Sequence, residues 1–393
     1  MSPLPDPAWV LRLPTSGTGP RLAVKDCIDI AGTITGGGSR AVTATAVPAL
    51  VDAPVVAAAR AQGARIVGKT GLVELCLRAD GLNEWAGTPR NPLDPARIPG
   101  GSSSGSAVVV ATGEADVAYG TDTGGSVRVP AACCGVAGLK TTAGRLSTLG
   151  VLELSRTLDT VGILAPDVAG LAVGMALAEP GFVVAAAPAG IRPRIARLRP
   201  AVRSVEVDAA VDRALAAVGA SVADVAVPEW EQWCADANDL MAAECWAAQR
   251  QCLRRPELLE PRHAADIAAG ERISAARVVQ CRRSAAHARE VLGALLREAD
   301  VLALPTLEEQ PPLLGAETAL TWLTVPLNLA GLPAVALPLT PVGGAIPASL
   351  QLVGSWLGEE HLLGWAAQIE HAQASGLRSR SLIFPALDGA ANS

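Results

Sequence analysis

Residues 100–106 read Gly-Gly-Ser-Ser-Ser-Gly-Ser, and residues 120–126 read Gly-Thr-Asp-Thr-Gly-Gly-Ser. Each stretch holds a Gly-Gly-Ser turn, and the two turns lie 24 residues apart with an apolar segment between them. A Gly-Gly pair lets backbone N–H groups point into a cavity, and hydroxyls stand beside both pairs. Isolated serine-glycine runs are usually flexible loops, but apolar elements flank these two turns. We therefore interpret them as parts of an oxyanion hole with a serine nucleophile.

Short β-rich runs alternate with Ala-rich helical stretches along the rest of the chain, which is typical of an α/β protein. The sequence predicts strands at 22–30, 65–67, 117–119, 136–139, 301–304, 334–337 and 349–353. Apolar residues that recur at intervals of three and four predict helices at 55–62, 106–112, 211–218, 240–253, 275–298 and 361–373. The middle of the chain is richer in arginine and in helix signals, which indicates a cap or an insertion in one sheet.

The composition excludes several classes of protein. Half of the 393 residues are hydrophobic and 18% are charged, which is typical of a globular chain and not of a disordered one. The net charge is −6 without a concentrated basic run, so we expect neither nucleic acid nor a membrane surface as a partner. Eight cysteines without a C-x-x-C pair predict neither a zinc site nor a disulfide framework. The N-terminal residues do not resemble a signal peptide, so we expect a cytoplasmic protein.

One segment has the length of a membrane span. Residues 168–191 number 24 and carry a single charge, Glu179. Glu-Pro-Gly at 179–181 divides the segment, and its many Ala and Gly residues bury little apolar surface. We therefore expect a short helix, a turn and a strand at 182–187 in place of a membrane helix.

A serine nucleophile needs a base, and histidine is the usual one. The four histidines lie far downstream in segments that we predict to be exposed helices: His263, His287, His361 and His371. Lysine is the next candidate, because the chain has only three lysines among its 32 basic residues. Arginine cannot lose its proton near neutral pH, so a retained lysine can serve where a proton acceptor is needed.

Lys25 lies in a mostly apolar run, which predicts a buried strand. Burial disfavours the charged ammonium, and a neutral amine can deprotonate a hydroxyl. The alternative is a lysine that extends from a strand edge or pairs with Asp26 or Asp29.

Three motifs together carry a family resemblance. The chain reads Val-Lys-Asp at 24–26, Pro-Gly-Gly-Ser-Ser-Ser-Gly-Ser at 99–106, and Gly-Thr-Asp-Thr-Gly-Gly-Ser-Val-Arg-Val-Pro-Ala-Ala-Cys-Cys-Gly-Val-Ala-Gly-Leu-Lys at 120–140. These motifs resemble the amidase signature family over about residues 20–165, with shorter matches at 328–334 and 350–354. The resemblance implies an α/β fold in which α-helices cover both sides of a twisted mixed β-sheet. It implies one large domain over residues 1–393, with a more helical, variable middle segment at about 190–300.

The resemblance also implies site residues. Ser126 would be the nucleophile, Ser102 a bridging serine after a cis Gly101–Ser102 peptide, and Lys25 the base. The backbone amides of the second turn would form the oxyanion hole: Thr123, Gly124, Gly125 and Ser126. Cys76 aligns with a family loop that faces the substrate. No metal and no cofactor are implied.

The implied activity is that of an amidase acting on linear amides. Ser126 would attack a small-molecule carboxamide, ammonia or an amine would leave, and water would hydrolyse the acyl-enzyme. The alternatives on the same fold are an acyltransferase and an amidotransferase subunit that depends on a partner. A homodimer is a further expectation.

Two competing motifs point to other enzymes. Residues 63–70 match the phosphate-loop pattern of nucleotide-binding proteins, but residues 65–67 are predicted to be a strand and a helix precedes them, which is the wrong context. Residues 101–105 match the G-x-S-x-G pattern, with Ser103 as the nucleophile of a Ser-His-Asp hydrolase. Three prolines at 92–99 precede this pattern, and a central strand would not hold them.

Overall fold

The computed structural model describes residues 7–15, 17–187, 191–200, 204–316, 319–341 and 346–381. Eleven strands in this part of the chain form one mixed sheet in the order β1-β3-β2-β4-β6-β5-β10-β11-β9-β7-β8. The strands are β1 (Trp9–Arg12), β2 (Arg21–Lys25), β3 (Arg65–Thr70), β4 (Val117–Asp122), β5 (Ala137–Lys140), β6 (Thr160–Ala165), β7 (Arg194–Leu198), β8 (Ser221–Val225), β9 (Val301–Pro305), β10 (Ala334–Pro338) and β11 (Ser349–Val353).

Parallel and antiparallel pairs are mixed across the sheet. β2 runs parallel to both β3 and β4, and β7 runs parallel to both β8 and β9. The remaining pairs are antiparallel. The central strands β4, β6 and β5 are buried along their whole length, as expected for a sheet covered on both faces. The predicted α/β class with a mixed sheet is confirmed.

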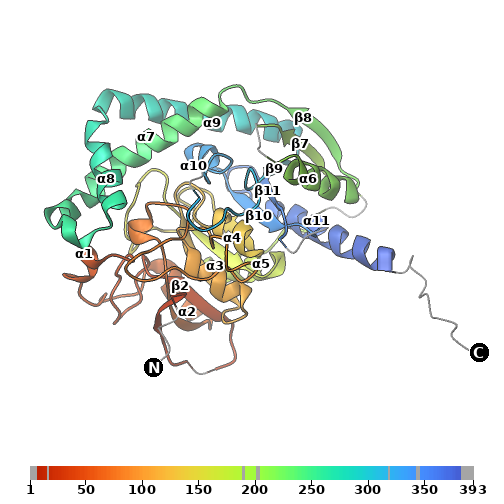
Figure 1. Cartoon of the computed structure of the whole chain (residues 1–393). Coiled ribbons are helices and arrows are strands. Elements are labelled where there is room, and N and C mark those ends of the chain that lie inside the picture. Colours follow the sequence, from red (N-terminus) through yellow and green to blue (C-terminus); the bar gives the residue numbers. More distant parts are fainter. Residues whose placement is uncertain are drawn as a thin grey trace, which may run out of the picture.

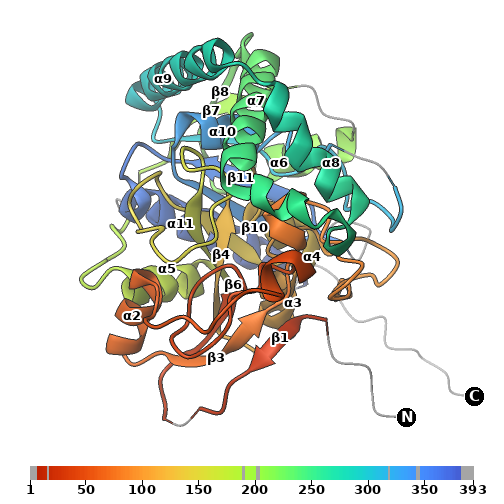
Figure 2. The same cartoon turned by 90° about the vertical axis from the view of Figure 1, so that its left-hand side faces the viewer.

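Helices cover the sheet (Figure 1). They are α1 (Arg40–Thr43), α2 (Pro54–Ala61), α3 (Ser104–Ala111), α4 (Arg128–Cys134), α5 (Val168–Ala178), α6 (Val205–Ala217), α7 (Trp230–Gln249), α8 (Pro261–Ala269), α9 (Ala275–Glu298), α10 (Val325–Ala330) and α11 (Glu359–Ser381). α3 and α4 pack on each other and on the central strands. Among the other helices, α5 contacts both α2 and α11, and α11 also contacts α6. α7, α8 and α9 lie together at the end of the molecule opposite β1 and α2 (Figure 2).

Local sequence explains where several helices begin. The side chain of Asp167 accepts a hydrogen bond from the Gly170 N–H at the start of α5, and Ser274 does the same for Arg277 at the start of α9. Such caps satisfy backbone donors that the first helical turn leaves free. α9 spans the predicted residues 275–298 without a difference.

One expectation about the chain after α5 was wrong. Residues 182–187 form no strand, because the Ala185 N–H donates to the Glu360 carbonyl in the first turn of α11 and not to a neighbouring strand. Of the two alternatives for the middle segment, a cap or an insertion in one sheet, its strands β7 and β8 favour the second, since they extend the sheet at one end. In the described part of the chain, no helix is long and apolar enough to cross a membrane.

Two glycines inside helices allow a matched test of the packing. A Cβ on Gly174 in α5 would lie 2.4 Å from Ile163 Cγ2, whereas a Cβ on Gly293 in α9 would meet no atom within 4 Å. We expect Gly174→Ala to lower the free energy of unfolding by about 1–3 kcal/mol through overpacking. Gly293→Ala should raise it by about 0.5–1 kcal/mol, because alanine favours the helix. Urea unfolding of both variants checks this, and equal midpoints would contradict it.

Candidate active site

The two Gly-Gly-Ser turns are in contact. The first turn leads into α3, and the second connects β4 with α4. The Ser103 N–H donates to the Ser126 carbonyl at 3.2 Å, which joins the turns through their backbones. The Gly101–Ser102 peptide is cis. The fold therefore brings Ser102 and Ser126 into one neighbourhood.

Lys25 is the last residue of β2, beside the parallel strand β4 that leads into the second turn. Its side chain is fully buried, and Nζ donates to Ser102 Oγ and to Thr121 Oγ1, each at 2.8 Å. Asp26 instead forms an ion pair with Lys69, with 2.9 Å between Oδ1 and Nζ, so the alternative ion pair between Lys25 and Asp26 is not formed. The structure thus brings Lys25 and Ser102 together, while their roles stay predictions.

All three lysines of the chain are fully buried. Lys69 donates to the Ile34 carbonyl in addition to Asp26, so it holds the loop that follows β2. Lys140 lies behind the second turn, where burial lowers the pKa of its amine to about 7. Of the three, only Lys25 is hydrogen-bonded to a serine.

The second turn presents free backbone donors. The N–H groups of Thr123, Gly124, Gly125 and Ser126 have no acceptor in the described part of the protein. Gly125 has φ 137°, which a residue with a side chain rarely adopts. The hydroxyl of Ser126 makes no hydrogen bond among the described residues, and the side chain lines a cavity. These donors are of the kind that stabilises an oxyanion.

A buried ion pair holds this turn. Arg128 Nη2 donates to Asp122 Oδ1 at 2.8 Å, and both side chains are fully buried. The N–H of Val127 also donates to Asp122 Oδ2, at 3.1 Å. Burial opposes the ionisation of Asp122, but the charge and hydrogen bonds of Arg128, the charge of Lys140 and a hydrogen bond from Asn328 hold the pKa of its carboxyl well below the usual range. Arg128 also donates to Asn328 and Gln351, so the pair ties the turn to α10 and β11.

Asp159 fixes the other side of the turn. Thr123 Oγ1 donates to Asp159 Oδ1 at 2.6 Å, and the N–H groups of Leu154 and Ser155 donate to Asp159 Oδ2. Burial raises the pKa of the Asp159 carboxyl to about 7, although these three donors favour its charged form. Asp159 therefore links the second turn to the loop that carries Leu154.

A cavity of about 220 Å³ opens above Ser126. Its lining includes Cys76, Thr123, Gly124, Ser126, Leu154 and Met241. Cys76 and Leu75 have φ 63° and 52°, and this left-handed turn places Cys76 at the wall of the cavity. Cys76 therefore lines the same cavity as Ser126, and its expected role in binding substrate stays a prediction.

Two cysteines lie near Thr121, one of the two residues whose hydroxyl contacts Lys25. Cys27 Sγ is 3.6 Å and Cys76 Sγ is 3.9 Å from Thr121 Oγ1. A hydrogen bond from Cys27, with the positive charge of Lys25 and a hydrogen bond with Ser102, lowers the pKa of the Cys76 thiol to about 5. Burial raises the pKa of Cys27. All eight cysteines are free and buried.

A buried carboxylate and a histidine anchor the loop that carries Cys76. Glu74 accepts from His263 Nδ1 and from the Glu260 N–H, each at 2.9 Å, and from Ser39 Oγ at 2.8 Å. The oxygen and nitrogen atoms of Glu74, Glu260 and His263 lie close enough for a metal site, but these hydrogen bonds already use both oxygens of Glu74. We interpret the cluster as a link between this loop and α8.

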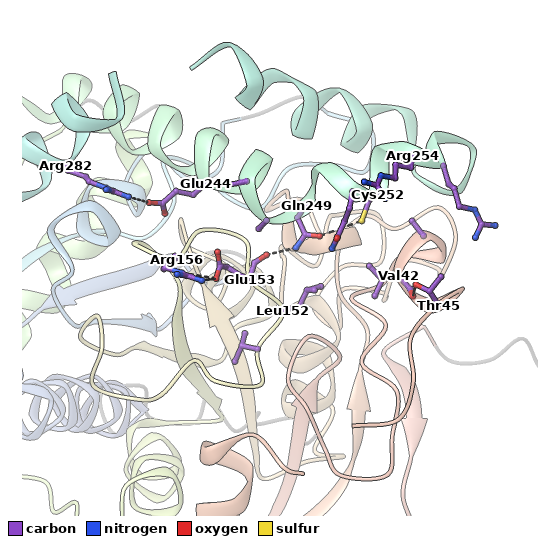
Figure 3. Close-up of a pocket in the computed structure, with 16 residues that line it drawn as sticks. Val42, Thr45, Leu152, Glu153, Arg156, Glu244, Gln249, Cys252, Arg254 and Arg282 are labelled. Carbon is purple, nitrogen blue, oxygen red and sulfur yellow. Dashed lines mark hydrogen bonds and ion pairs between the residues drawn. The ribbon is translucent and has the colours of Figure 1, made fainter. Parts of the chain in front are cut away.

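A larger cavity lies elsewhere in the described structure and holds none of the predicted site residues. It has a volume of about 970 Å³ between α1, the loop at 151–156 and the end of α7. Its charged side chains largely pair with each other, as Glu244 with Arg282 and Glu153 with Arg156 (Figure 3). Burial raises the pKa of Cys252, the cysteine in this cavity. It therefore offers no activated nucleophile.

The competing motifs do not form the sites that they suggest. Ser103 donates to the Thr121 carbonyl and is fully buried. Lys69 belongs to β3 itself and not to a loop that could wrap a phosphate. The expectation of an exposed helix was wrong for His263, which is fully buried because it pairs with Glu74.

Sequence reasoning missed several residues of the site. Thr121 lies in the quoted second turn, and its place at the end of a buried strand next to Lys25 could have identified it. Asp159 follows a Thr-Leu pair but carries no local signal for its contact with Thr123. Met241 comes from α7, far along the chain, and no pattern in the sequence predicts its place at the cavity.

Comparisons with known proteins agree with this geometry. The family model "Amidase" matches residues 18–179. Amidase 1 of Oryza sativa subsp. japonica is 47% identical over 160 residues, which is 41% of this chain but only 36% of that protein. A subunit of the glutamyl-tRNA(Gln) amidotransferase of Halobacterium salinarum is 32% identical over 91% of this chain and 96% of its own length.

A solved structure supports the same assignment. The crystal structure of an amidase superposes with a TM-score of 0.80 at 29% sequence identity, covering 90% of this chain and 84% of the other. The similarity therefore extends over most of this chain, beyond the motif region. This chain belongs to the amidase signature family of enzymes that act on C–N bonds.

Proposed function

We propose that this chain hydrolyses the C–N bond of a small-molecule carboxamide through an acyl-enzyme on Ser126. The observation that carries the proposal is the hydrogen bond of 2.8 Å from buried Lys25 to Ser102, next to a turn whose N–H groups have no acceptor among the described residues. A buried amine bonded to a hydroxyl supports a base, and the free N–H groups support an oxyanion hole.

In the proposed reaction, the Lys25 amine accepts the proton of Ser102, Ser102 accepts that of Ser126, and Ser126 Oγ bonds to the amide carbon. The hydroxyl of Ser126 has no bond in the described structure, so it must turn toward Ser102 when substrate fills the cavity. The proton then returns through Ser102 to the nitrogen, the C–N bond breaks, and ammonia or an amine leaves. Water, deprotonated by the same route, hydrolyses the ester and releases a carboxylic acid.

The second turn stabilises the charge that forms on the carbonyl oxygen. Donors from Thr123 to Ser126 are fixed in advance, since Asp122 holds the turn from one side and Asp159 from the other. Fixed donors need no reorganisation during the reaction, and one such donor typically contributes about 10²–10³ in rate. The proposed base, nucleophile and oxyanion donors all belong to this chain.

Ser126→Ala should abolish turnover while leaving the fold intact, because Ser126 is the only nucleophile in the proposed mechanism. We expect a loss of at least about 10⁴-fold in the release of ammonia from primary amides. The assay uses the purified chain without ATP or a second subunit, with circular dichroism as the control for folding. Ammonia release at a rate near that of the wild type would contradict the assignment, and a strict need for ATP and a partner would favour an amidotransferase subunit.

The two relay residues can be tested against a matched serine. Ser102→Ala and Lys25→Met should each lose at least about 10³-fold in kcat/KM, because both interrupt the proton path. Ser104, also fully buried and two residues from Ser102, has a hydroxyl without a hydrogen bond. Ser104→Ala should therefore retain activity within a few-fold. Equal losses in Ser102→Ala and Ser104→Ala would show that the effect is structural.

Cys76 should be alkylated by iodoacetamide at pH 6.5, with loss of activity. The thiolate is the reactive form, and the lowered pKa of Cys76 keeps it populated at this pH. Cys252 is the matched control, because it also lines a cavity but has a raised pKa. Peptide mass spectrometry measures both sites, and an amide substrate should protect Cys76. Labelling of Cys252 ahead of Cys76 would refute this expectation.

A further inference from the structure

The cavity above Ser126 restricts the substrate by its size. Its volume of about 220 Å³ lies below the range of about 300–1,000 Å³ that holds drug-sized ligands. An amide held within this cavity would therefore be smaller than a drug-sized ligand.

Met241 forms part of the cavity wall beside the proposed oxyanion hole. A Cβ on Gly124 would lie 3.4 Å from Met241 Cε, 3.5 Å from Val325 Cγ2 and 3.9 Å from Thr321 Cγ2. Met241 and Thr321 line the same cavity as Gly124 and Ser126, so their side chains border the space open to a substrate. Leu154 adds another apolar side chain to the same cavity.

The charged side chains at the cavity are already paired. Arg78 donates to both carboxylate oxygens of Asp266, at 2.8 and 2.9 Å. Asp80 accepts from Arg262 at 2.7 Å. Arg78 and Asp80 are the only arginine, lysine or carboxylate side chains among the described lining residues, and their charges cancel. A substrate carboxylate would have to compete with Asp266 for Arg78 to gain a cation.

We propose that the enzyme selects short, uncharged acyl groups and that the Met241 side chain sets their maximum length. The inference rests on the proposed amidase function and adds the substrate class. It follows from the small volume, the methyl groups beside Gly124 and the internal pairing of Arg78 and Asp80.

The test uses primary amides, in which the leaving group is always ammonia and only the acyl group varies. For the wild type we expect kcat/KM for butanamide to exceed that for octanamide at least tenfold. The kcat/KM for pentanamide should exceed that for succinamate, a chain of similar length with a carboxylate, by at least tenfold. The Ser126→Ala variant measures the background with each amide.

Met241→Ala should raise the ratio of kcat/KM for octanamide to kcat/KM for butanamide at least fivefold, because it removes the Met241 side chain from the cavity wall beside Gly124. Met241→Leu keeps a side chain of similar volume and should keep the wild-type ratio, which separates the wall from a general loss of structure. An unchanged ratio in Met241→Ala would overturn the role of Met241.

The outcomes separate this inference from the proposed function. Hydrolysis that depends on Ser126 but favours octanamide or succinamate would overturn the inference and leave the amidase assignment intact. Absence of hydrolysis with every amide would overturn both.

Discussion

The site depends on one buried ion pair, between Asp122 at the end of β4 and Arg128 at the start of α4. Charges that are fully buried persist only when they are paired and hydrogen-bonded, and removing one partner typically costs about 3–5 kcal/mol. Here Asp122 also accepts a hydrogen bond from the Val127 N–H. Arg128 also donates to Asn328 and Gln351, which lie near the other end of the chain. The turn at 123–126 is therefore held by contacts from four elements, which explains how its N–H groups can stay without acceptors in the described part of the protein.

Much of the fold and site followed from the sequence because the informative residues are close together in the chain. Strands such as 349–353 and the helix at 275–298 were predicted because apolar periodicity is local. β6, β7 and β8 were not, and the strand expected at 182–187 was wrong, because pairing with distant segments decides those regions. Lys25, Ser102 and Ser126 were predicted through motifs. Met241 reaches the cavity from α7 and His263 anchors the loop of Cys76 from α8, and neither residue leaves a local pattern.

The middle segment thus has two roles. Its strands β7 and β8 extend the sheet, and its helices supply Met241 at the cavity wall and His263 behind the loop of Cys76. The expected variability of this segment stays a prediction, as do the single domain over residues 1–393, the homodimer and the cytoplasmic location. The sheet order shows that strands from both halves of the chain meet at β5 and β10.

The burial of all three lysines has a practical consequence. The positive charges on the surface come from guanidinium groups, and no ε-amino group faces the solvent. Amine-directed reagents, such as activated esters or glutaraldehyde, would find no lysine on the exterior of the native protein. Cross-linking or immobilisation by that chemistry would have to use the terminal amine.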